Sequence, residues 1–415
     1  MSYHILFSML VVISALASYI NYKFLKLPKT IGLTIVTLII SMFVIAMLKV
    51  FPDWFTPINH LLGAIDFKET VLNVMLGYLL FAGALHVNAI DLRKNLFPII
   101  YLASFGVLTS TILSGLLIWW VSGLIGLPIS LPYCLLFGAL ISPTDPIAVL
   151  AVFKETKAVP KKIKMRITGE ALFNDAAGIL LFVLLMNIFV NHTGTSTGVI
   201  VYNIFHEALG GIIVGWILAS TVSLILKNVD DKEVAVLVTL AISSAGYVLS
   251  QKLEVSAPIA MVIAGLVIGS NMKKGKFTKR TIIALDSFWE LIDEVLNAFL
   301  FVLIGLEMLT INFHPIVIVT GVIAFIVIFI TRYISVSIPT LFLNIKLRKF
   351  YWRENLLMSW GGIRGGISIA LALSIPSDAS GSIISLTYVV VIISILGQGS
   401  TFKWLVNKLF PQKDK

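Results

Sequence analysis

Ser142-Pro143-Thr144-Asp145-Pro146 lies in the middle of an apolar run that covers residues 131–153. Each proline removes a backbone N–H and clashes with the preceding turn, so this run is predicted to be interrupted. A second run, 354–375, contains Trp360-Gly361-Gly362-Ile363-Arg364-Gly365-Gly366, where each glycine costs a helix about 1 kcal/mol relative to alanine. Paired interruptions in the two halves of a membrane chain are typical of transporter binding sites and inverted repeats.

The composition around these two stretches indicates a membrane protein. The chain has 415 residues, of which 58% are hydrophobic and 13% charged, with a mean hydropathy of +0.99. Soluble domains are about 45–50% apolar and about 25% charged, so a soluble globule or a disordered chain is excluded. A single cysteine, Cys134, rules out a disulfide framework or a cysteine-built metal site.

Thirteen apolar runs are long enough to cross a bilayer, which takes about 20 residues each. They are not the alternating segments of a β-barrel, so we predict an all-α polytopic membrane protein of about 13 transmembrane helices. The runs lie near residues 3–22, 31–50, 70–90, 97–124, 131–153, 163–191, 203–226, 233–252, 256–272, 284–308, 315–343, 354–375 and 383–405.

The basic residues test this count of helices. Of the 31 lysines and arginines, 26 lie in alternate connections and the C-terminal tail, while Lys49, Lys68 and Lys252 lie on the other side. The positive-inside rule then places the N-terminus outside and the C-terminus in the cytoplasm. The net charge of +10 is therefore a topology signal and does not indicate nucleic acid.

No further domain or nucleotide site is expected. The first run lacks a basic leader and a cleavage site, so it is predicted to be a retained helix. There is no glycine-rich nucleotide fingerprint, no cofactor is expected, and the tail is too short for a soluble regulatory domain. An ion gradient is the expected source of energy for transport.

Several ionisable residues lie deep in the predicted helices. Arg364 follows Arg353 by 11 residues, or about 16 Å of helix, which is about half the hydrocarbon thickness. Asp145 and Asp175 each lie about 13–14 Å from the basic end of their helix, and Arg332 lies about 21 Å from its own. An intramembrane charge costs at least about 2.5–3.5 kcal/mol, so it persists where it is paired or functional. Buried ion pairs that only fix helix packing are the structural alternative.

The charges at the two breaks have the signs that broken helices require. A break exposes a partly positive N-terminus and a partly negative C-terminus. Asp145 can neutralise the positive ends and Arg364 the negative ends. Simple kinks are the alternative, but a kink does not require a charge of the appropriate sign beside it.

A nearby group of polar side chains offers oxygen ligands. Asp175, Asn174 and Thr144 supply carboxylate, amide and hydroxyl oxygens, which Na⁺ prefers. A carboxylate whose pKa is set by burial and nearby cations can bind a proton or a cation, but not both. One such carboxylate predicts exchange of one cation for one proton, without net charge movement.

At these residues the sequence resembles the bacterial NhaP-type sodium/proton antiporters, in the CPA1-like branch of the monovalent cation:proton antiporter superfamily. The motifs that carry the resemblance are residues 142–146, 169–175 (Gly-Glu-Ala-Leu-Phe-Asn-Asp), 303–307 (Leu-Ile-Gly-Leu-Glu) and 361–366. The resemblance implies the NhaA-like fold with two crossed, interrupted helices. It also implies a homodimer in the cell membrane, and alternating access by an elevator-like movement of the ion-binding core.

The resemblance also implies roles for individual residues. Asp175 corresponds to the carboxylate that binds Na⁺ and a proton in turn, with Thr144 as a further Na⁺ ligand and Asn174 at the branch-defining position. Asp145 and Arg364 correspond to the charges at the helix crossing. Glu170 and Arg332 correspond to a buried ion pair. Ala171 and Ala82 replace polar residues of some relatives, with His86 one turn from Ala82 as a candidate substitute.

The expected organisation is a single membrane transporter unit, 1–415. Its ion-binding core lies around 70–191 and 284–375, and its dimerisation part consists of 3–50 and 203–272. The predicted activity is exchange of cytoplasmic Na⁺ or Li⁺ for external H⁺. K⁺/H⁺ exchange on the same scaffold is the nearer alternative and a cation channel the more distant one. An enzyme is not expected, because an intramembrane hydrolase would need a nucleophile with a base, or paired catalytic acids.

Overall fold

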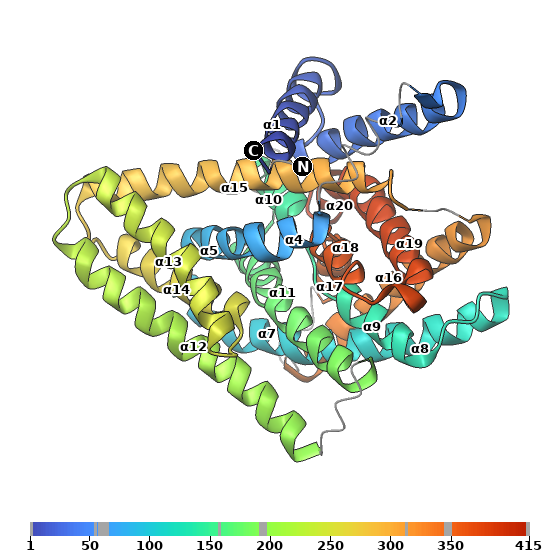
Figure 1. Ribbon diagram of the computed structural model, residues 1–415. Helices are drawn as coiled ribbons and strands as arrows, with labels where there is room; N and C mark the ends of the chain where they lie inside the picture. The colour runs from blue at the N-terminus through green and yellow to red at the C-terminus, as the bar shows by residue number, and fades with distance from the viewer. Residues whose placement is uncertain are drawn as a thin grey trace. The chain divides into compact units, whose positions relative to one another are not determined.

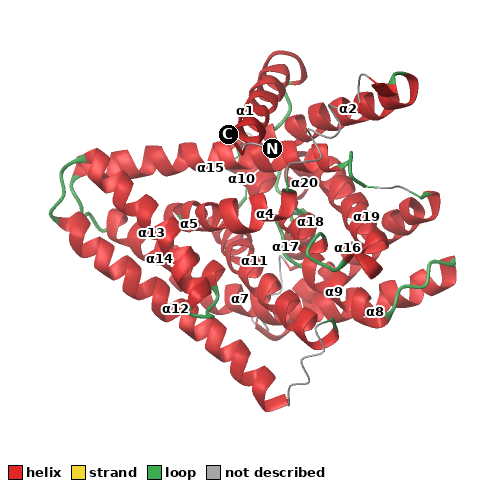
Figure 2. Cartoon of the chain, in the orientation of Figure 1, coloured by secondary structure: helices red, strands yellow, loops and turns green. Residues whose placement is uncertain are grey.

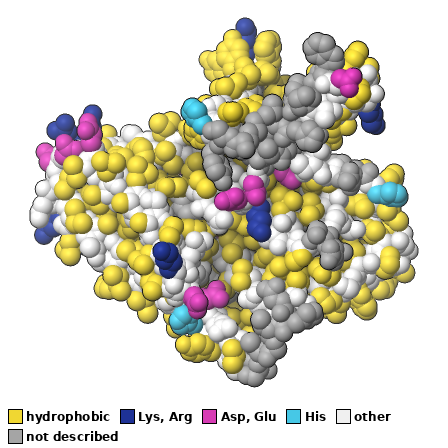
Figure 3. Space-filling view, viewed as in Figure 1, with side chains coloured by type: hydrophobic (Ala, Val, Ile, Leu, Met, Phe, Trp, Pro, Cys, Tyr) yellow, Lys and Arg dark blue, Asp and Glu magenta, His cyan; other side chains and the backbone are white. Residues whose placement is uncertain are grey.

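The computed structural model describes residues 3–53, 56, 66–156, 159–190, 197–311, 314–343 and 351–411, and these residues form helices without a strand (Figure 2). Some basic residues on which the topology prediction depends, at position 157 and within 344–350 and 412–415, lie outside the described residues. Within it, nine helices are long and apolar enough to cross a membrane, and Leu131–Ile141 and Ala257–Lys273 are shorter apolar helices. Hydrophobic side chains cover much of the face shown in Figure 3, as expected for a surface in lipid. The predicted all-α membrane fold is confirmed.

The chain folds into two compact units. The first comprises Met1–Val71, Thr109–Pro160 and Asn297–Lys415, and the second comprises Leu72–Leu108 and Lys161–Leu296. This division differs from the predicted core and dimerisation parts, which are functional assignments and stay a prediction.

The first unit contains both interrupted helices. Its π-helical turns, Asn21–Leu25 and Ser394–Gln398, continue α1 and α19. Its helices are α1 (Tyr3–Ile20), α2 (Lys29–Val50), α4 (Phe67–Glu69), most of α8 (Val107–Ile125), α9 (Leu131–Ile141), α10 (Ile147–Glu155), the end of α15 (Lys279–Glu307), α16 (Pro315–Leu343), α17 (Tyr351–Trp360), α18 (Gly366–Ala372), α19 (Ser377–Ile393) and α20 (Gly399–Leu409).

The second unit contains the long α11. The π-helical turn Thr70–Met75, which begins in the first unit, precedes α5, and the π-helical turn Leu102–Gly106 follows α7. Its helices are α5 (Leu76–His86), α6 (Ala89–Lys94), α7 (Leu96–Tyr101), α11 (Lys161–Phe189), α12 (Thr197–Lys227), α13 (Lys232–Lys252), α14 (Ala257–Lys273) and the first part of α15.

Small residues let the helices of the second unit pack closely. α14 contacts α5, α12 and α13, and lies beside them in Figure 1. A Cβ on Gly265 or Gly269 would overlap the backbone carbonyl of Phe81 or Leu85 on α5. Close backbone approach at glycines is a common way for membrane helices to associate, because lipid offers no hydrophobic driving force between them.

Both predicted interruptions are present in the structure. α9 ends at Ile141 and α10 begins at Ile147, so Ser142–Pro146 is non-helical. The missing N–H groups of the two prolines explain this break. α17 ends at Trp360 and α18 begins at Gly366, which leaves the glycine-rich segment 361–365 between them. The break between α9 and α10 and the break between α17 and α18 are therefore local consequences of the sequence.

Candidate ion-binding site

The two broken helices meet within the first unit. The backbone N–H of Asp145 donates a hydrogen bond of 2.7 Å to the carbonyl of Ile363. Residues more than two hundred positions apart are thereby joined at the middle of each break. α18 also contacts α9, so the two interrupted segments cross one another.

Arg364 donates hydrogen bonds to carbonyl groups at the end of α9. Its side chain is 2% exposed, and Nη1 donates to the carbonyl oxygens of Ser142 (2.6 Å) and Pro143 (2.9 Å). Carbonyls at a helix C-terminus have no donor within the helix and carry partial negative charge. The guanidinium therefore supplies both the hydrogen bonds and the charge that the end of α9 lacks. The Ser394 hydroxyl accepts from the backbone N–H of Arg364 (2.9 Å) and anchors the break to the last span.

Asp145 accepts a hydrogen bond from the backbone at the start of α10. Its Oδ1 accepts a hydrogen bond of 2.9 Å from the backbone N–H of Ile147, the first residue of α10. A carboxylate in this position satisfies an orphan donor and interacts favourably with the positive end of the helix. A Cβ on Gly365 would lie 2.7 Å from Oδ2 of Asp145, so the carboxylate needs a glycine at this position.

Two more predicted residues lie at the crossing. Thr144 and Arg332 are both buried, with exposures of 4% and 3%. A Cβ on Gly362 would be 3.1 Å from Nε of Arg332 and 3.3 Å from Cγ2 of Thr144. A small cavity of about 10 Å³ lies here, and its polar lining includes Arg332, Arg364, Ser359 and Gln398. A space of this size corresponds to about one water molecule.

The sequence reasoning missed the polar residues of the last span that reach this crossing. Ser394 binds the backbone of Arg364 and also donates to Gln398 Oε1, and both side chains are buried. Their signal in the sequence is a serine and a glutamine in an apolar run, with nothing to indicate the partner helix. The contacts hold the end of α19 to the broken helix α17–α18.

The remaining predicted residues lie on α11, in the second unit. Glu170 and Asn174 are buried, and they are one turn apart on the same side of the helix. Asp175 is half-buried and follows Asn174 directly. α11 runs from Lys161 to Phe189 without a break, so these side chains stand on a regular backbone. The pairing of Glu170 with Arg332, and the sharing of Na⁺ by Asp175 and Thr144, would join the two units and stay predictions.

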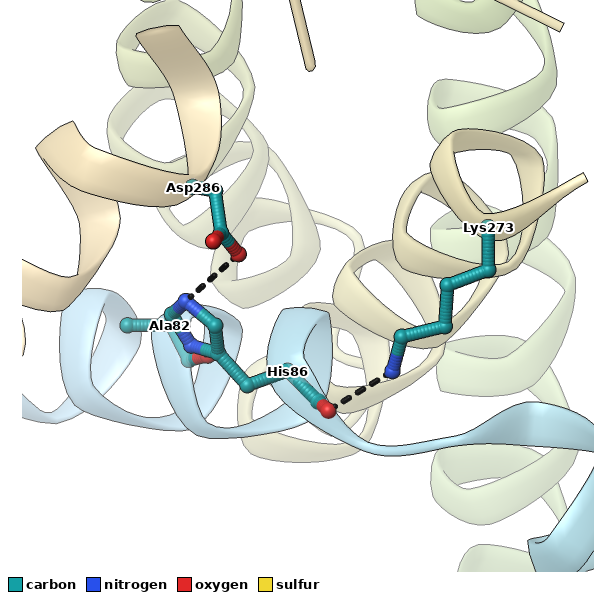
Figure 4. A network of polar contacts seen from close by, with 4 residues as sticks. All are labelled: Ala82, His86, Lys273 and Asp286. Atoms are coloured by element: carbon teal, nitrogen blue, oxygen red, sulfur yellow. Dashed lines mark hydrogen bonds and ion pairs between the residues drawn. The ribbon is translucent and has the colours of Figure 1, made fainter. Parts of the chain in front are cut away.

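His86 takes part in a separate polar network of the second unit (Figure 4). Its Nδ1 lies 2.9 Å from the carbonyl of Ala82, and its Nε2 lies 3.4 Å from Oδ1 of Asp286 on α15. Lys273 of α14 donates to the His86 carbonyl at 2.7 Å. His86 therefore links α5 to α14 and α15 through its backbone carbonyl and its ring.

Comparison with known proteins identifies the family. Residues 11–408 match the family model described as "Sodium/hydrogen exchanger, transmembrane". The chain is 38% identical over 409 residues to the Na(+)/H(+) antiporter NhaP of Pseudomonas aeruginosa, covering 96% of this chain and 95% of that protein. It is 31% identical to the Na(+)/H(+) antiporter NhaH of Halobacillus dabanensis, covering 93% of both chains.

The fold has a counterpart among solved structures. The sodium proton antiporter MjNhaP1 of Methanocaldococcus jannaschii superposes with a TM-score of 0.75 at 21% sequence identity, covering 98% of both chains. The similarity confirms the predicted antiporter fold, and the sequence matches confirm the predicted family. The chain belongs to the sodium/hydrogen exchanger family, in its NhaP-type branch.

Proposed function

We propose that the protein exchanges cytoplasmic Na⁺ or Li⁺ for external H⁺, in a one-to-one ratio without net charge movement. The observation that carries the proposal is the crossing of two broken helices, at which Arg364 donates to the end of α9 and Asp145 accepts from the start of α10. Irregular backbone at membrane depth occurs where it is buried in protein or lines a cavity, and it marks ion sites in transporters. The two relatives reported above are both named Na(+)/H(+) antiporters, which supports the same activity.

Asp175 is the proposed exchange group. A carboxylate binds either a proton or a cation, so loading one excludes the other. Asn174 beside it does not titrate, so a single proton is exchanged for each monovalent cation. Asp145 is engaged at the start of α10, which assigns it a role at the crossing. Thr144 is proposed to complete the site with a hydroxyl or carbonyl oxygen.

The proposal includes the setting of the protein. The N-terminus faces outside and the C-terminus the cytoplasm, in the cell membrane, because 26 of the 31 basic residues lie on one side. Two copies form a dimer through 3–50 and 203–272, and the core around 70–191 and 284–375 moves. The protein acts as a transporter and not as an enzyme.

Flux measurements in proteoliposomes test the proposal. An imposed pH gradient is followed with a fluorescent dye while Na⁺, Li⁺ or K⁺ is added, with the membrane potential clamped or unclamped. Dissipation of the gradient by Na⁺ and Li⁺, at the same rate with and without the clamp, is the expected result. A response to K⁺ alone would assign K⁺/H⁺ exchange, and a rate that follows the clamp would contradict electroneutrality.

The assignment of Asp175 is tested with Asp175→Asn. This variant keeps the size of the side chain but cannot release a proton, so exchange should fall to the level of empty liposomes. Glu233→Gln removes an exposed acid at the start of α13, in the same unit, and should retain exchange. Asp175→Asn exchanging at the wild-type rate would refute the assignment.

A further inference from the structure

A cavity in the second unit lies between α11 and α12. Its volume is about 50 Å³, enough for more than one water molecule or a partly hydrated ion. It is lined by two helical faces: residues 180, 184, 187 and 188 of α11, and residues 200, 203, 204 and 207 of α12. These spacings of three and four residues place each set on one side of its helix. Most of the lining is leucine and isoleucine.

Three polar side chains interrupt this apolar lining: Asn187 of α11, and Asn203 and Glu207 of α12. Together they offer a carboxylate and two amide oxygens, the hard ligands that Na⁺ and K⁺ prefer. Glu207 is half-buried among these apolar side chains. A carboxylate in a membrane helix needs compensation for its lost hydration, and a bound cation provides it.

The position of the cavity relates it to transport. Asn187 follows Asp175 by 12 residues on the same unbroken helix, or about 18 Å toward the side that the charge distribution assigns to the outside. The cavity therefore lies on the helix of the proposed exchange group, beyond its reach for direct contact.

We infer that Glu207, Asn187 and Asn203 form a peripheral site for a monovalent cation at the outer end of α11. The site holds a cation near the outer approach to Asp175 and raises its local concentration there. The inference rests on the proposed function, since it concerns the ion that the exchanger carries. It assigns Glu207 a role in access from one side and none in the exchange step.

Measurements from each side of the membrane test the inference. Uptake of ²²Na⁺ is followed in right-side-out vesicles, where the cation meets the outer face, and in everted vesicles, where it meets the cytoplasmic face. Glu207→Gln should raise the outer KM about threefold to tenfold, the effect expected for one charge a few ångströms away in partly solvated surroundings. The inner KM and the maximal rate should stay at wild-type values.

A matched control separates the site from general surface charge. Asp53 is exposed beyond the end of α2, on the same predicted side, and Asp53→Asn removes one negative charge from a residue that does not line the cavity. It should leave both KM values unchanged. An outer KM that stays at the wild-type value in Glu207→Gln, or rises equally in Asp53→Asn, would overturn the inference.

Two further variants keep the test decisive. Asn203 is exposed, so Asn203→Leu should fold and still raise the outer KM, while Glu207→Asp should restore most of the affinity that Glu207→Gln loses. A normal outer KM in Asn203→Leu would contradict the assigned ligand set. The two proposals fail separately: wild-type exchange by Asp175→Asn refutes the exchange site, whereas an unchanged Glu207→Gln refutes only the peripheral site.

Discussion

The helix crossing and α11 differ in whether their backbone groups need side chains as hydrogen-bond partners. At the crossing the backbone is broken, and the charges of Arg364 and Asp145 bind backbone groups that the breaks expose. On α11 the helix is continuous from Lys161 to Phe189, and its backbone groups are bonded within the helix. Asn174 and Asp175 are therefore not needed to complete the backbone. A charged residue deep in a membrane protein can be there to bind backbone groups that a helix break exposes. That structural role has to be considered before the residue is given a role in transport.

The largest effect is expected for Arg364→Gln. This change removes the buried donor to the carbonyls of Ser142 and Pro143, and unsatisfied buried groups cost about 2–5 kcal/mol together. The melting temperature of the purified protein should fall strongly and exchange should be lost. Arg364→Lys keeps the charge and one hydrogen bond, so its melting temperature should lie between those of the wild type and Arg364→Gln. Wild-type stability of Arg364→Gln would contradict the structural role of the guanidinium.

A smaller loss is expected for Gly365→Ala. The added Cβ would lie 2.7 Å from Oδ2 of Asp145 and would displace the carboxylate from the start of α10, at a cost of about 1–3 kcal/mol. Thermal unfolding measures the effect. Gly123→Ala on α8 is the control, because an added Cβ there meets nothing within 4 Å. Equal stability of the two variants would show that the crossing tolerates displacement of Asp145.

The smallest effect concerns the network of Figure 4, which belongs to neither region. His86→Gln replaces the ring that contacts the Ala82 carbonyl and Asp286, so it should lower the free energy of unfolding. The side chains of His86 and Asp286 are both partly exposed, so the loss should stay below about 1 kcal/mol. Asp286→Asn changes only the partner of the ring and should cost no more than His86→Gln. A loss of several kcal/mol in either variant, measured by thermal unfolding, would contradict the small contribution assigned to this network.

Much of the fold could be predicted from the sequence because its causes are local. Apolar runs of sufficient length form membrane-spanning helices, and prolines and glycines interrupt a helix at their own positions. The breaks at 142–146 and 361–365 can therefore be predicted from the sequence. The sequence alone indicated less clearly which distant residues contact one another in the fold. Ser394 and Gln398 reach the crossing from the last span, and the need for glycine at 365 comes from Asp145, 220 positions earlier. Such contacts depend on tertiary packing, which a single sequence does not display.

The proposed competition at Asp175 is the central claim, and steady-state kinetics tests it most directly. Initial exchange rates are measured against Na⁺ concentration at a series of pH values on the cation side. If a proton and Na⁺ compete for one carboxylate, the KM for Na⁺ should rise as the pH falls, while the rate at saturating Na⁺ stays constant. A KM that is independent of pH, with a maximal rate that falls in acid, would contradict competition at a single group.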